Sequence, residues 1–131
     1  MKKALQLAVI LLAFLPAISF AQAEKNVWPE MKDFHAVMAA SFHPVEDGNY
    51  APLKEKAESL FTTAKAWQKS AIPASFKPVE TKAALKKLVI KCAAVNKGVQ
   101  ANLSSDKLKV LITEAHDVFH TIAGECRRTE E

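Results

Sequence analysis

Residues 29–44, PEMKDFHAVMAASFHP, decide the fold. Apolar side chains recur in this stretch at three- and four-residue spacing, which is the period of one face of an α-helix. Pro29 suits the first turn of a helix, and Pro44 predicts that the helix ends near residue 43. The apolar positions are Met31, Phe34, Val37, Met38, Ala39 and Phe42. The stretch therefore predicts an amphipathic helix over residues 29–43.

Three further amphipathic helices follow downstream, each bounded by Pro, Gly or Ser. Nowhere does the chain show a convincing two-residue alternation of the kind that predicts a β-strand. Short connections between four such helices predict an all-α, antiparallel up-down-up-down four-helix bundle. The later helices are expected over residues 50–71, from Pro78 through Val99, and from the cap Ser104-Ser105-Asp106 through Ile122.

The residues before this domain carry the features of an export signal. A basic start at residues 1–3 precedes an apolar run over residues 4–20, and Ala21-Gln22-Ala23 fits a signal peptidase site. An uncleaved membrane anchor is the alternative, but the run is short for a membrane span and contains Gln6 and Pro16. We therefore expect a signal peptide over residues 1–23 and a periplasmic domain over residues 24–131, off the membrane after cleavage.

The composition indicates one globular domain and argues against a nucleic-acid partner. Of the 131 residues, 50% are hydrophobic, and only three are glycine. The net charge is +4, and half of it comes from Lys2 and Lys3 in the signal segment. The remaining basic residues form no large cluster of the kind that binds phosphate backbones.

The predicted bundle also places the polar core candidates along its axis. In antiparallel helices, residues equally far before and after the centre of a turn lie side by side. On this basis His35, Glu58, Cys92 and His116 lie at one height along the bundle axis, and Met31 faces His120. His43 falls about 12 Å away along the axis, so it is interpreted as a helix-end residue near the last carbonyls.

The same register bears on the two cysteines. Cys126 lies about 15 Å from Cys92, beyond the roughly 7 Å that a disulfide spans between Cα atoms. No intramolecular disulfide is expected, and a homodimer linked through Cys126 is left open.

The histidines predict a metal site between the first and last helices. His116 and His120 are one helical turn apart and can converge on one ion, and His35 faces them from the first helix. Imidazole suits copper and zinc, whereas sulfur favours softer ions such as copper. The predicted ligands are His35, His116 and His120, with Met38, Met31 and Cys92 as weaker candidates.

Each weaker candidate also has a plain structural interpretation. Met31 and Met38 fit as filler of an irregular core, and Cys92 fits as a small inert apolar residue. The carboxylates Glu58, Glu114 and Asp117 could complete a metal site or simply face solvent; such carboxylates often orient a ligating imidazole.

The stretch Ile112-Thr-Glu-Ala115-His116-Asp-Val-Phe119 resembles the haem-attachment region of the cytochrome c prime family. That family carries Cys-x-x-Cys-His here, and Ile112 and Ala115 stand at the two attachment positions, so the resemblance excludes covalent haem. It implies a four-helix bundle with a ligand site between the first and last helices. His116 takes the place of the axial histidine, and Met31 matches the Met ligand of the related b-type periplasmic cytochrome.

The sequence is compatible with three functions. The first is a transition-metal-binding protein with copper or zinc as its ion, used for carriage, buffering or sensing. The second is a cytochrome-like protein with non-covalent haem, since His and Met are both axial ligands. The third is a structural or partner-binding bundle without metal. No phosphate-binding loop, serine elbow or H-E-x-x-H motif occurs, so an enzyme is not expected.

Overall fold

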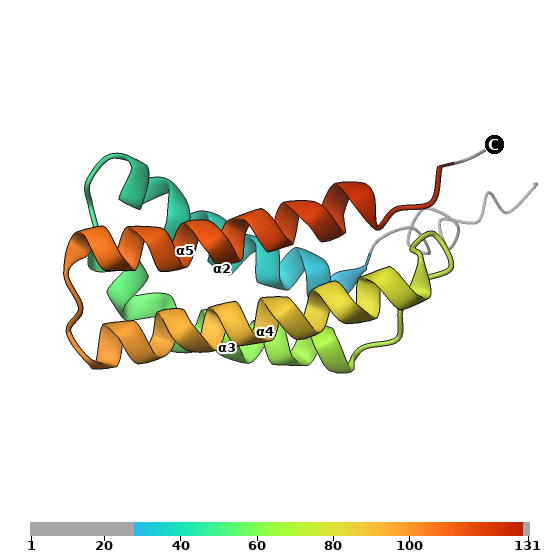
Figure 1. The fold of residues 1–131 in the computed structure, drawn as a ribbon, viewed down its shortest axis with the longest axis horizontal. Helices are drawn as coiled ribbons and strands as arrows, with labels where there is room; N and C mark the ends of the chain where they lie inside the picture. Colours follow the sequence, from blue (N-terminus) through green and yellow to red (C-terminus); the bar gives the residue numbers. More distant parts are fainter. Residues whose placement is uncertain (1–27, 130–131) are drawn as a thin grey trace, which may run out of the picture.

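The computed structural model describes residues 28–129, and within them the chain forms four long helices and no strand (Figure 1). These are α2 (Pro29–Glu46), α3 (Ala51–Lys69), α4 (Pro78–Gln100) and α5 (Ser105–His120), and a π-helical turn, η1 (Thr121–Glu125), continues α5. The predicted signal peptide lies outside the described residues.

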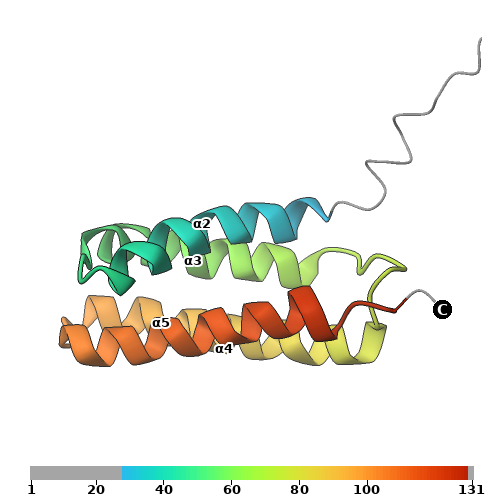
Figure 2. The ribbon, with the colours of Figure 1, turned by 90° about the horizontal axis from the view of Figure 1, so that it is seen from above.

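The four helices pack in chain order as an all-α bundle, which confirms the predicted fold class. α2 packs on α3, α3 on α4 and α4 on α5, and α2 also contacts α5. Viewed from above, α2 and α3 form one layer and α4 and α5 form the other (Figure 2). In the described part of the chain no helix combines the length and apolar character needed to cross a membrane.

Local sequence explains where most helices begin. Pro29, Pro52 and Pro78 each stand in the first turn, where a missing N–H is tolerated. α5 instead begins with Ser104, whose hydroxyl accepts a hydrogen bond from the backbone N–H of Lys107 at 3.4 Å.

The predicted end of the first helix at residue 43 is wrong. α2 continues through Pro44 to Glu46, and Gly48, with a φ of 80°, reverses the chain. A proline inside a helix removes one backbone hydrogen bond. Here Val45, the next residue, is only 1% exposed, and its burial offsets part of that cost.

An aromatic cluster fills the core at the end of the bundle where α2 begins and α5 ends. The ring of Trp67 lies 5.5 Å from Trp28, 5.3 Å from Phe34 and 6.1 Å from Phe119, measured between centroids. This cluster holds α2, α3 and α5 together.

The C-terminal segment is tied to the loop between α3 and α4. The N–H of Lys77 donates to the carbonyl of Cys126 at 2.8 Å, and the N–H of Arg128 donates to the carbonyl of Ser75 at 2.8 Å. Cys126 therefore lies at the start of α4, whereas Cys92 lies about 22 Å further along it by the helical rise. Both cysteines are buried free thiols.

Gly98 lets α4 lie close to leucine side chains of α5 and of the turn before it. A Cβ at this position would lie 2.9 Å from the Leu111 Cδ1 and 3.1 Å from the Leu103 Cδ1. In an open helix, Gly→Ala gains about 1 kcal/mol, but overpacking a core typically costs about 1–3 kcal/mol. Gly98→Ala is therefore expected to lower the free energy of unfolding by about 1 kcal/mol, measured by urea denaturation.

Gly124→Ala is the matched control, because a Cβ there meets no atom within 4 Å. This variant should be neutral or slightly stabilising. Equal stabilisation by the two substitutions would contradict the close approach inferred at Gly98.

Candidate metal centre

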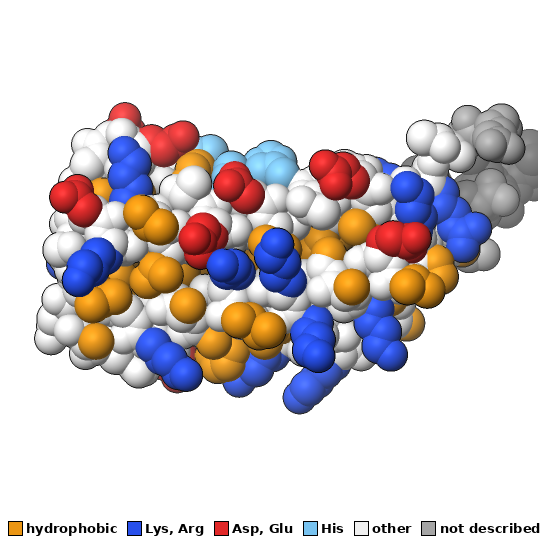
Figure 3. All heavy atoms as spheres, viewed as in Figure 1, with side chains coloured by type: hydrophobic (Ala, Val, Ile, Leu, Met, Phe, Trp, Pro, Cys, Tyr) orange, Lys and Arg blue, Asp and Glu red, His pale blue; other side chains and the backbone are white. Residues whose placement is uncertain are grey.

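All four histidines of the chain lie along the line where α2 meets α5, together with two phenylalanines. The rings contact one another in sequence, at centroid distances of 5.1, 5.5, 4.4, 3.8 and 5.9 Å. We call this set the histidine row, and its members in order are His35, Phe119, His120, His116, Phe42 and His43. Histidine side chains are visible along the upper edge of the molecule in Figure 3.

His116 and His120 form the centre of this row. They stand one turn apart on α5, and their Nε2 atoms lie 3.1 Å apart. Two nitrogens bound to one ion at about 2.0–2.1 Å lie about 2.9–3.4 Å apart when the bond angle is between square and tetrahedral. The pair therefore already has the spacing of a bidentate metal ligand. His120 is exposed and the His116 side chain is 21% exposed, so an ion can reach both from solvent.

The structure does not bring His35 into this pair. Its ring is stacked on Phe119 with an interplanar angle of 11°, and the residue is exposed. The reason is the register between helices. Because α2 runs to Glu46 and α3 begins at Ala51, the first turn is centred two residues later than Pro44 predicts. Each reflection doubles that shift, and the shifts of the two later turns cancel, so His35 moves four residues along α5, from the level of His116 to that of His120. There its ring is stacked on Phe119.

The sulfur candidates lie away from the His116–His120 pair or inside the core. Met38 is 1% exposed and Cys92 is fully buried. Burial raises the pKa of the Cys92 thiol to about 12, so it is not the thiolate that a metal ion binds. Met31 is half-buried and lines a cavity of about 330 Å³ together with Trp28, His35 and Phe119.

The carboxylate candidates are also dispersed. Glu114 accepts a hydrogen bond from the Lys91 Nζ at 2.8 Å, and Glu58 is exposed on α3. The Asp117 Oδ1 lies 4.0 Å from the His116 Nδ1, which is an ion-pair distance but not a hydrogen bond. Between residues 28 and 129 no three His, Cys, Asp or Glu side chains are grouped closely enough to hold an ion.

His43 is the member of the row that the sequence analysis set aside. It follows Phe42, whose ring is stacked on His116, and its own ring lies edge-on to Phe42. The His43 Nδ1 lies 3.1 Å from the Glu46 Oε2. A histidine followed three residues later by a glutamate is a helical spacing that could have drawn attention to this pair.

The electrostatics of the row favour neutral imidazole at His116. Burial lowers the pKa of His116 below its ordinary value of 6.5, and the nearby His120 lowers it further. Asp117 raises this pKa, His43 lowers it and Glu46 raises it, each by less. Neutral imidazole is the form that binds a metal ion, so His116 is available as a ligand at neutral pH.

This lowered pKa predicts how the metal-free protein responds to acid. Below about pH 6.5 the unfolded chain protonates His116 more readily than the folded chain does, so the free energy of unfolding decreases as the pH is lowered. The His116→Gln variant should show a smaller fall between pH 7 and pH 5 in urea denaturation. His35→Gln is the control and should follow the wild type; identical curves for His116→Gln and wild type would contradict the assignment.

Comparison with protein-family profiles, with curated proteins and with solved structures gives no significant match.

Proposed function

We propose that this chain is an exported metal-binding protein that holds a transition-metal ion, copper or zinc, between α2 and α5. The observation that carries the proposal is the 3.1 Å separation of the His116 and His120 Nε2 atoms. The two nitrogens lie within hydrogen-bond distance of each other, so a bound ion would replace that contact, and the lowered pKa of His116 keeps its ring neutral. A periplasmic location rests on the export signal predicted over residues 1–23.

The position of the pair supports a carrying, buffering or sensing role rather than a structural one. Structural zinc sites are closed by four protein ligands. The pair supplies two nitrogens at the protein surface, so other coordination positions stay open to further ligands and to exchange. Imidazole nitrogen suits both zinc and copper, and copper(II) binds more tightly than zinc at most such sites.

A bare ion fits this location better than haem does. The ring of Phe42 lies 3.8 Å from His116 and covers the face that points toward α2. Phe34, Trp67 and Phe119 fill the adjoining core, so a porphyrin would have to displace several packed rings.

The test is a metal assay on the protein as purified from the periplasm, followed by titration of the metal-free form with Zn²⁺ and Cu²⁺. The proposal expects one equivalent of ion per chain and no Soret band. An intense Soret band would support the haem alternative. No bound metal, no haem and no change in melting temperature on adding either ion would leave only a structural or partner-binding bundle.

A further inference from the structure

We infer that His43 supplies the third imidazole to the ion held by His116 and His120, through its Nε2 atom, with Glu46 as its positioning residue. This inference rests on the proposed function and extends it, because it assigns a ligand on α2 and thereby a bridge between two helices.

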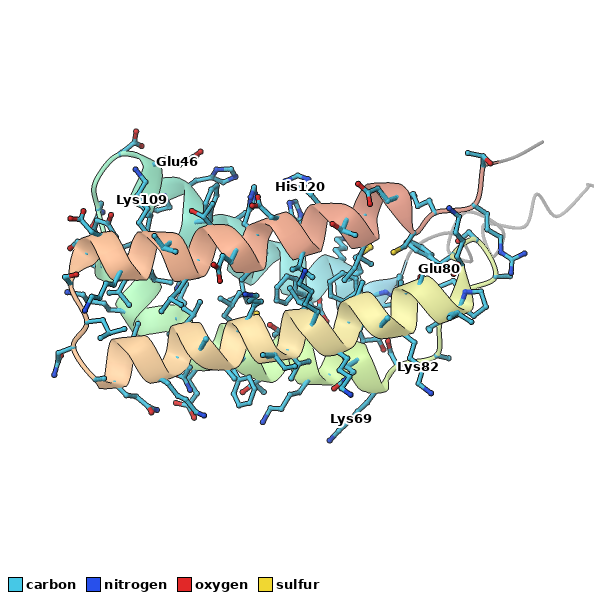
Figure 4. The ribbon with its side chains drawn as sticks, viewed as in Figure 1. Glu46, Lys69, Glu80, Lys82, Lys109 and His120 are labelled. Atoms are coloured by element: carbon cyan, nitrogen blue, oxygen red, sulfur yellow. The ribbon has the colours of Figure 1, made fainter. Side chains whose placement is uncertain are left out.

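The first step is the shared contact of Phe42. Its ring is stacked on His116 at 3.8 Å with an interplanar angle of 11°, and the ring of His43 lies edge-on to it at 5.9 Å. His43 and His116 are therefore neighbours of the same ring, although they come from different helices. Figure 4 places Glu46 and His120 along the same edge of the bundle.

The second step concerns which nitrogen of His43 is free. The Nδ1–H of His43 can donate to the Glu46 Oε2 at 3.1 Å, and this hydrogen bond favours the tautomer whose Nε2 carries the lone pair. A carboxylate that accepts from one ring nitrogen while the other binds metal is the usual support of a ligating histidine. Glu46 thus orients the ring without touching the ion.

The third step is the freedom of the side chains to close on an ion. The side chains of His43 and Glu46 are 65% and 57% exposed, so solvent leaves them room to change rotamer. Among residues 28–129 no three candidate ligands already lie close enough together to hold an ion. The His116–His120 pair would therefore bind the ion first, and the His43 side chain would then rotate toward it from α2. His35 lacks this arrangement, since its ring is stacked on Phe119 at the other end of the row.

The resulting ligand set defines the class of ion. Three imidazole nitrogens, with the sulfur of Met38 and Cys92 kept in the core, favour Zn²⁺ or Cu²⁺ over the softer Cu⁺. Three histidines with a fourth position open to solvent match an exchangeable site rather than a closed one.

The experiment measures the Zn²⁺ affinity of the full chain by competition with a chromophoric chelator. It compares wild type with His43→Ala, Glu46→Gln and the matched control His35→Ala, which removes another exposed histidine of α2 in the same row. His43→Ala should weaken binding by at least about 100-fold and Glu46→Gln by about 10-fold, while His35→Ala should bind as the wild type does.

A second readout counts the nitrogens directly. The electron paramagnetic resonance spectrum of the Cu²⁺-loaded wild type should show three imidazole nitrogens, and that of His43→Ala should show two. Wild-type affinity and an unchanged nitrogen count in His43→Ala would overturn the inference and leave the His116–His120 pair intact. Failure of the wild type itself to bind either ion would overturn the proposed function together with this inference.

Discussion

His116→Ala is expected to remove most of the rise in melting temperature that Zn²⁺ produces in the wild-type protein. An ion present at about 100 times its dissociation constant stabilises the folded state by about 2.7 kcal/mol when it binds that state alone. For a domain of this size that stabilisation raises the melting temperature by roughly 10–20 °C. The variant removes one of the two nitrogens that stand 3.1 Å apart, and a single remaining imidazole of that pair binds weakly.

The measurement is differential scanning calorimetry with and without Zn²⁺, and the quantity compared is the metal-induced shift. This choice matters because His116→Ala also removes the ring stacked on Phe42, which changes the stability of the metal-free protein. His120→Ala should lose the shift as well, and His35→Ala should keep it. A full shift in His116→Ala would contradict the assigned site.

Trp67→Ala is expected to lower the free energy of unfolding by about 3–5 kcal/mol. Trp67 is fully buried, and its ring lies against Trp28, Phe34 and Phe119 from three directions. Small domains are stable by only about 5–15 kcal/mol, so the variant would lose a large part of its stability. Urea denaturation monitored by circular dichroism measures the loss.

Trp67→Phe provides the comparison. The Trp67 Nε1–H is buried and finds no acceptor among the described residues, so phenylalanine removes an unpaired donor while keeping most of the apolar ring. The loss should be clearly smaller than for alanine. Val110→Ala changes a side chain that is 57% exposed and should have little effect. Equal denaturation curves for Trp67→Ala and Val110→Ala would contradict the role assigned to the aromatic cluster.

The fold and one half of the candidate site follow from local patterns. The apolar spacing, the prolines of the first turns and the Ser104 cap predict four helices, and their short connections predict the bundle. The contact between His116 and His120 follows from helix geometry, because residues four apart on one helix always lie one turn above each other.

The other half of the site depends on tertiary structure. Which residue of α2 lies near His116 is set by the length and shape of the turns and by the packing of the helices. The structure puts Phe42 there, seven residues or about two turns beyond His35. The sequence favours His35, whereas the structure puts Phe42 on His116 with His43 beside it.

The sequence by itself therefore determined the helices, their order and the spacing of the two imidazoles on α5, since each depends on interactions within a few residues. Only the tertiary structure decided that Phe42 of α2 stacks on His116 of that pair. A proline at residue 44 does not stop a helix when the next side chain, Val45, is buried in the core, and that balance depends on packing between distant segments.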